Sequence, residues 1–194
     1  MDAESIWDSL LSASGKLDLN QIGGPSEELG DKMIRRAVYA KVSRMYPNEY
    51  QAIFDFPTPT ISAERRYTTN VPQQRLFFLN NAFVQKQAEM LAERIRFAGN
   101  EEAQVKKAFE IVYERMPAPE ELASSLSFLR EAAETPAAPA PAVAANVAAK
   151  PESAGASWMS AKDDDKPAAD KSRDSPIKSF CWALLSSNEF LFID

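Results

Sequence analysis

The sequence predicts a mainly α protein: an irregular helical domain of about six helices, with a long disordered insert rich in alanine and proline before the C-terminal helix. Apolar residues recur at helical spacing through most of the chain, and capping residues and prolines separate these runs. Nearly half of the residues from Thr135 to Pro176 are alanine or proline, and such a segment buries too little apolar surface to offset the entropy of ordering it. We therefore expect a domain over 1–134, a linker over 135–176, and a C-terminal helix with an apolar tail over 177–194 that docks back on the domain.

Two helices are expected in the first 47 residues. The first begins at Asp2, which can cap its N-terminus, and ends at Gly15. A loop follows over 16–30, where glycine and proline supply turn residues. A second helix is predicted over 31–47 because apolar residues recur there at helical spacing. These residues are Ile34, Val38, Val42 and Met45.

Three aromatic residues at four-residue spacing, Tyr46, Tyr50 and Phe54, follow the second expected helix. Such a row can stack sugars or bases, but packing in the core is the simpler interpretation. Beyond it, the segment 55–71 contains prolines, β-branched threonines and scattered charges. This composition predicts an extended, irregular connector.

Three further helices are predicted before the linker. Pro72 suits the first turn of a long helix that reaches about Ala98. Asn100 can cap the next helix, which Pro117 ends, and Pro119 begins another. The apolar stripe of the long helix consists of Leu76, Leu79, Phe83, Ala88, Leu91 and Ile95.

After the linker, a short apolar helix is predicted from Ile177, and the chain then runs into the apolar segment 190–193. Exposure of so apolar a segment is unfavourable, so we expect it to fold back onto the main body. Cys181, the single cysteine, lies in this helix between two aromatic residues. A buried, unreactive thiol is the simplest interpretation.

Composition argues against several classes of function. The chain has 22 basic and 28 acidic residues, a net charge of -6, which opposes a nucleic-acid surface. It has no histidine, and its six glycines form no phosphate loop or dinucleotide fingerprint. The N-terminus lacks the features of a signal peptide, and no segment is suited to span a membrane. We expect no catalytic residue, metal or cofactor, and lean against an enzyme.

A small candidate cluster, functional or structural, remains: Asp55, Arg65, Arg66 and Asn80. Paired carboxylates such as Asp55 and Glu64 can carry acid–base chemistry without histidine. The simpler interpretation is that Asp55 caps a turn and that the two arginines are its partners. The run Asp163-Asp164-Asp165-Lys166 lies in the expected linker and is interpreted as solvating charge.

Several sequence phrases occur in an order typical of one family. They include Leu11-Ser12-Ala13-Ser14-Gly15-Lys16-Leu17-Asp18, Gly23-Gly24-Pro25, Arg35-Arg36-Ala37-Val38-Tyr39, Phe54-Asp55-Phe56-Pro57, Thr69-Asn70-Val71-Pro72-Gln73-Gln74, Arg115-Met116-Pro117 and Trp182-Ala183-Leu184-Leu185-Ser186-Ser187-Asn188-Glu189-Phe190. Together they resemble the C-terminal half of a planctomycete-type domain of unknown function (DUF1553-like). This domain occurs in large proteins that also carry planctomycete cytochrome c domains.

The resemblance implies partners rather than a reaction. Relatives carry an upstream half of the domain, so the chain is expected to be a fragment whose partner is that missing domain or another protein. The family suggests an extracytoplasmic or cell-envelope location, although this chain shows no signal peptide. It has no CxxCH motif, so no haem is expected here. Arg75 departs from the alanine that relatives tend to carry.

Three hypotheses follow. The leading one is a noncatalytic helical module that packs against, or completes, another domain. The alternative is an extracytoplasmic enzyme or glycan-binding component that uses Asp55, Arg65 and nearby aromatic residues such as Tyr67, which requires a concave pocket. Nucleic-acid binding is third, because the net acidity opposes it.

Overall fold

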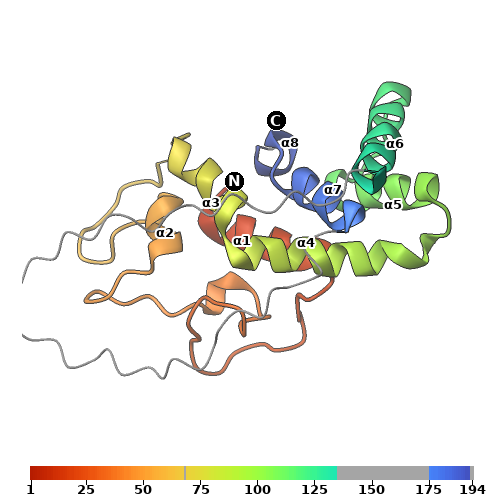
Figure 1. Cartoon of the computed structure of the whole chain (residues 1–194). Coiled ribbons are helices and arrows are strands. Elements are labelled where there is room, and N and C mark those ends of the chain that lie inside the picture. Colours follow the sequence, from red (N-terminus) through yellow and green to blue (C-terminus); the bar gives the residue numbers. More distant parts are fainter. Residues whose placement is uncertain (68, 135–174, 193–194) are drawn as a thin grey trace, which may run out of the picture.

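The computed structural model describes residues 1–67, 69–134 and 175–192, and every regular element in these ranges is a helix (Figure 1). The elements in chain order are α1 (Ala3–Ser14), η1 (Ala37–Tyr39), α2 (Glu49–Ile53), α3 (Pro72–Asn80), α4 (Ala82–Ile95), η2 (Arg96–Ala98), α5 (Glu101–Tyr113), α6 (Pro119–Glu134), α7 (Pro176–Leu185) and α8 (Asn188–Leu191), where η marks a 3₁₀ helix. The mainly α prediction is confirmed. Of the predicted linker over 135–176, residues 135–174, with the acidic run, lie outside the described residues, and Pro176 begins α7. Residues 193–194 of the predicted apolar tail also lie outside them.

Helix α1 is buried along most of its length. Leu10 and Leu11 are almost completely shielded from solvent. The helix ends at Gly15, whose φ of 76° lies in the left-handed region. The Arg94 guanidinium of α4 donates hydrogen bonds to the carbonyls of Ser12 at 3.0 Å and Ala13 at 2.9 Å, and so satisfies the last turn of α1.

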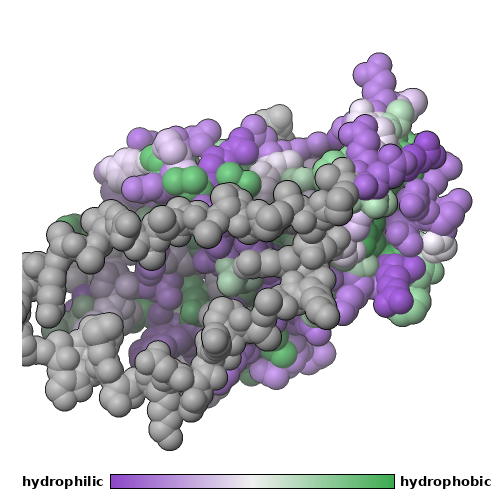
Figure 2. Space-filling model, in the orientation of Figure 1, coloured by the Kyte–Doolittle hydropathy of each residue, from purple (hydrophilic) through white to green (hydrophobic). Residues whose placement is uncertain are grey.

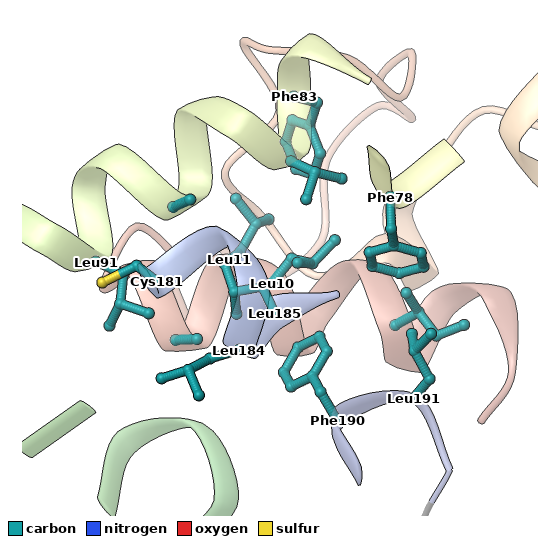
Figure 3. Close-up of a cluster of buried hydrophobic side chains, with 14 of the residues drawn as sticks. Leu10, Leu11, Phe78, Phe83, Leu91, Cys181, Leu184, Leu185, Phe190 and Leu191 are labelled. Atoms are coloured by element: carbon teal, nitrogen blue, oxygen red, sulfur yellow. The ribbon is translucent and has the colours of Figure 1, made fainter. Parts of the chain in front are cut away.

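The core lies where α1, α4, α7 and α8 meet (Figure 3). Side chains from all four helices point into it, and the labelled ones are Leu10, Leu11, Phe83, Leu91, Cys181, Leu184, Leu185, Phe190 and Leu191, together with Phe78 of α3. Helices α7 and α8 therefore supply one side of a core whose other side comes from the first hundred residues.

No helix of the described ranges is long and apolar enough to cross a membrane.

Ion pairs and hydrogen bonds hold the C-terminal helices against α5. Arg115 contacts Glu189 at 2.6 Å and Glu121 at 2.7 Å, linking the turn between α5 and α6 to α8. The Tyr113 hydroxyl donates to the carbonyl of Leu184 at 3.2 Å and contacts the Ser187 hydroxyl at 2.8 Å. The Trp182 indole nitrogen donates to the carbonyl of Phe78 in α3 at 2.8 Å.

The predicted helix over 31–47 is wrong. Residues 31–32 form a turn, and Arg35 and Ala40 form isolated β-bridges with Asp18 and Glu27. Between α1 and residue 48, η1 is the only helical turn. The cause is a pair of hydrogen bonds to residues elsewhere in the chain: the Asp8 carboxylate accepts from the Ala37 amide at 2.6 Å, and the Asp18 amide donates to the Ile34 carbonyl at 2.8 Å. These bonds satisfy backbone groups that a helix would otherwise pair internally.

The prediction of one continuous helix over 72–98 is also wrong, because this segment forms two α-helices, α3 and α4, followed by η2. Asn81 is extended, with ψ of 127°, and separates α3 from α4. Its side-chain oxygen accepts the Phe83 amide at 2.8 Å and caps α4. Because the two helices have separate axes, their apolar faces do not align, and Leu76 and Leu79 are exposed while Phe78 is buried.

Candidate functional site

Three of the four predicted candidate residues share one hollow. Asp55, Arg65 and Arg66 line an open depression of about 560 Å³ on the connector between α2 and α3, together with Tyr67 and Glu64. Asn80 lies elsewhere, at the C-terminus of α3, where its side-chain amide donates to the Leu76 carbonyl at 3.0 Å. The structure thus brings together the charged residues of the connector and leaves Asn80 apart from them.

Asp55 organises the connector. Its carboxylate accepts hydrogen bonds from the Thr69 amide at 2.7 Å and the Thr69 hydroxyl at 2.8 Å, and the Gln74 amide group lies at 3.5 Å. Its φ of 56° is in the left-handed region, which aspartate tolerates better than most residues. The prediction that the two arginines are its partners is wrong, because Thr69 and Gln74 occupy that role.

Arg66 is held by the N-terminus of α1. Its two terminal nitrogens contact the two carboxylate oxygens of Glu4 at 2.6 and 2.7 Å, a bidentate geometry that favours arginine–carboxylate pairs. The hydrogen bond from Arg66 lowers the pKa of Glu4, and the same bond raises the pKa of Arg66. Arg66 therefore ties the connector to α1.

Arg65 has no such partner. Its guanidinium forms no hydrogen bond or ion pair with any described residue and lies 5.7 Å from the centre of the exposed Tyr67 ring. Five donor groups of Arg65 are thus available to a ligand at the rim of the hollow. The chemistry that this rim offers is donation to an acceptor group beside an aromatic face.

A second, smaller hollow of about 270 Å³ adjoins the first, and Asp55, Arg66 and Tyr67 line both. Its walls include the apolar residues Ile6 and Phe54. Across the described ranges, no group of three or more histidine, cysteine, aspartate or glutamate residues is placed to hold a metal ion. Cys181 is buried, and desolvation raises the pKa of its thiol to about 12, as expected for an unreactive side chain.

Sequence reasoning missed a surface on the segment 32–38. The side chains alternate: Met33, Arg35 and Ala37 are buried, and the residues between and beside them are exposed. We call the exposed set the outer face, and it consists of Lys32, Ile34, Arg36 and Val38. No alternation of apolar and polar residues in the sequence predicts this pattern of burial. A basic residue, Arg35, is buried, and the aliphatic residues Ile34 and Val38 are exposed.

Arg35 anchors this segment from within. Its terminal nitrogens donate to the carbonyls of Gly23 and Pro25, and one contacts Glu27 at 2.8 Å. The guanidinium lies 4.3 Å from the centre of the Tyr39 ring. The loop that precedes the segment is therefore closed over a buried cation, which fixes the backbone that carries the outer face.

Further apolar side chains stand exposed near the outer face in the sequence. The exposed large hydrophobic residues of the segment 16–47 are Leu19, Ile22, Ile34, Val38, Val42, Met45 and Tyr46. Ile22, Met45 and Tyr46 are each at least 80% exposed, whereas aliphatic and aromatic side chains are usually buried. Figure 2, which shows one face of the molecule, likewise has hydrophobic residues among a mainly hydrophilic surface.

Comparison with known proteins identifies one family model. The model described as PSD1, a protein of unknown function (DUF1553), matches residues 1–129. The match spans α1 to most of α6 and stops before α7 and α8, which complete the core. No curated protein and no solved structure matches the chain.

Proposed function

Since the chain belongs to the PSD1 family of proteins of unknown function (DUF1553), we propose a function from its surface: a noncatalytic helical module that packs against, or completes, another protein domain. The observation that carries this proposal is the group of exposed apolar side chains on the segment 16–47. Large contiguous apolar patches mark sites of association, and the concentration of these side chains in one segment supports such a role.

The anchoring of the segment supports a role in association. A flexible loop would lose conformational entropy when a partner orders it, which weakens binding. Its apolar side chains could also fold onto the helices instead of facing a partner. Here Arg35 and Asp8 hold the backbone in place. The apolar residues are thus presented outward by a fixed scaffold, and a partner meets a preformed surface.

A variant with Ile22→Ser, Val38→Thr, Met45→Gln and Tyr46→Ser tests the proposal. Because these side chains are exposed, the thermal midpoint is expected to change by no more than about 3 °C. Immobilised wild-type chain is expected to retain a partner protein from its native cells, and the variant to lose it. A matched control with Phe97→Ser and Met116→Ser removes exposed apolar residues elsewhere and is expected to retain the partner.

The proposal fails if the wild-type chain is monomeric and retains no protein, or if the control loses the partner as completely as the variant. It also fails if the variant unfolds, because the apolar residues would then serve the chain's own stability.

A second candidate is a glycan-binding component at the connector. The observation that favours it is the joint position of Arg65 and Tyr67 at one hollow, since a donor beside an aromatic ring suits the hydroxyl groups and the apolar face of a sugar. Titration with a panel of neutral and acidic oligosaccharides tests this role. Binding that Arg65→Ala and Tyr67→Ala each weaken at least tenfold supports it, and the absence of binding removes it.

A further inference from the structure

The outer face combines two kinds of side chain. Ile34 and Val38 are apolar, and Lys32 and Arg36 are basic, so basic and apolar side chains alternate along the segment, which ends in η1. Lys32 forms no ion pair with a described residue. Arg36 uses its Nε for Asp8 at 3.3 Å, and its terminal nitrogens donate to no described residue although the side chain is 59% exposed.

The charge of this region is opposite to that of the whole chain. Residues 31–47 contain five basic residues and one acidic residue, whereas the chain has a net charge of -6. Arg35 and Lys41 pair with Glu27 and Glu28, and Arg36 pairs with Asp8 through its Nε. Lys32 and Arg44 form no ion pair with a described residue. Complementary charge steers association and selects partners. An acidic partner is therefore attracted to the cations that remain: Lys32, Arg44 and the terminal nitrogens of Arg36.

We propose that the outer face of residues 32–38 docks an acidic segment of a partner protein that also carries apolar side chains. Carboxylates of the partner pair with Lys32 and with the free terminal nitrogens of Arg36, and its apolar side chains cover Ile34 and Val38. This inference rests on the proposed function and specifies the chemistry of the partner.

The same charges disfavour the other macromolecules that basic and apolar residues can bind. Each lysine or arginine near the surface of an anionic membrane contributes only about 1 kcal/mol to the binding free energy. The few available cations of the outer face therefore attract a chain of net charge -6 only weakly to such a membrane. Nucleic-acid affinity depends on many phosphate contacts. A protein segment requires only local complementarity, which the outer face supplies.

Selection from a random dodecapeptide library displayed on phage tests the inference. The bait is the full chain. Counter-selection against the double variant Lys32→Glu, Val38→Ser removes the peptides that bind elsewhere on the chain. The peptides that remain are expected to be net acidic and to carry aliphatic or aromatic residues. Each is expected to bind the double variant at least tenfold more weakly and to weaken as NaCl rises from 50 to 300 mM.

The matched control is Arg96→Glu with Phe97→Ser, which makes the same changes at η2, where both residues are exposed. It is expected to alter peptide affinity less than twofold. The inference is overturned if the remaining peptides are neutral or basic, if no peptide distinguishes the wild-type chain from the Lys32–Val38 variant, or if the control weakens binding equally. Stronger binding to phosphatidylserine vesicles than to any selected peptide overturns it as well.

The two proposals fail separately. One result would separate them: the wild-type chain retains a partner that the four-residue surface variant loses, but the library yields no acidic peptide. The chain would then bind a partner protein, and the acidic character proposed for that partner would be wrong.

Discussion

At the scale of single residues, hydrogen bonds from polar side chains set the shape of segments that have no regular secondary structure. The Arg35 side chain is 5% exposed and donates to Gly23, Pro25 and Glu27. Asp55 plays a similar part in the connector through Thr69. Both residues therefore fix backbone geometry through hydrogen bonds that a helix or a sheet provides elsewhere.

Replacement of Arg35 by methionine is expected to loosen the segment 18–41 without unfolding the helices. Hydrogen bonds to a charged group contribute about 1.5–3 kcal/mol, and their loss here is local. Amide hydrogen exchange is expected to accelerate across 18–41 and to stay unchanged in α4. Arg36→Met, which removes an exposed side chain, serves as the control, and equal acceleration in both variants would contradict the role of Arg35.

Gly15→Ala tests the left-handed end of α1. A side chain at φ of 76° is strained, and the expected loss of stability is about 1 kcal/mol. The Arg94 side chain lies 3.5 Å from the position of the added carbon, an ordinary contact, so the loss comes from the backbone. Urea denaturation measures it against Gly30→Ala, where the backbone is not left-handed and the surroundings are open. Similar losses in both variants would refute the assignment.

At the scale of elements, helix boundaries defined by capping residues could be predicted, whereas the helix inferred from apolar spacing over 31–47 could not. Asn100 caps α5 and Gly15 ends α1, as the sequence indicates. The spacing of Ile34, Val38 and Val42 is equally regular, but it occurs on a segment whose backbone bonds to Asp8 and Asp18 instead of forming an α-helix. Those partners are distant in sequence, so no local pattern reveals them. The same limit applies to the candidate cluster. The sequence located Asp55, Arg65 and Arg66 on one connector, but it did not reveal the contact partners of Asp55 and Arg66.

Asn81→Ala tests the separation of α3 from α4. Loss of an N-cap residue typically costs about 1 kcal/mol, and we expect a loss of this size in chemical denaturation. Asn80→Ala is the control, because Asn80 is exposed and contacts only the carbonyl of Leu76. A loss for Asn80→Ala as large as for Asn81→Ala would show that the cap does not account for the effect.

The ion pair between Arg115 and Glu121 of α6 predicts a pH dependence of stability. Hydrogen bonds from Arg115 lower the pKa of Glu121 from 4.5 to about 2. Because the pKa is lower in the folded state, the stabilisation is present above pH 4.5 and is lost as the pH falls towards 2. Glu121→Gln is therefore expected to be less stable than wild type at neutral pH and to approach it in acid. Thermal midpoints from pH 2 to pH 7, with Glu120→Gln as control, measure this, and a constant difference across the range would exclude it.

At the scale of the whole molecule, the region that matches the family model does not contain the complete core. Leu184 and Leu185 of α7 and Leu191 of α8 pack against α1 and α4, yet the match ends at residue 129. The packing of α7 could be expected from its apolar sequence. Its docking position could not, because it depends on surfaces assembled from α1 and α4.

Truncation after Glu134 is expected to abolish cooperative thermal unfolding, because several fully buried side chains of α1 and α4 then face water. A synthetic peptide of residues 175–192 is expected to restore a cooperative transition when added to the truncated chain. The same peptide with Leu185→Asp is expected to fail. Cooperative unfolding of the truncated chain alone, monitored by circular dichroism, would refute this dependence.

The late position of α7 also bears on how the chain folds during synthesis. Its contacts with α4 join residues about 90 positions apart, and contacts between such distant residues form slowly. At typical translation rates, the 40 residues between Glu134 and Ser175 take roughly 2–8 s to synthesise. Throughout that interval, the apolar sides of α1 and α4 have no cover from α7. The nascent chain therefore passes through an aggregation-prone stage on the ribosome, which makes it a candidate substrate for chaperones before its core can close.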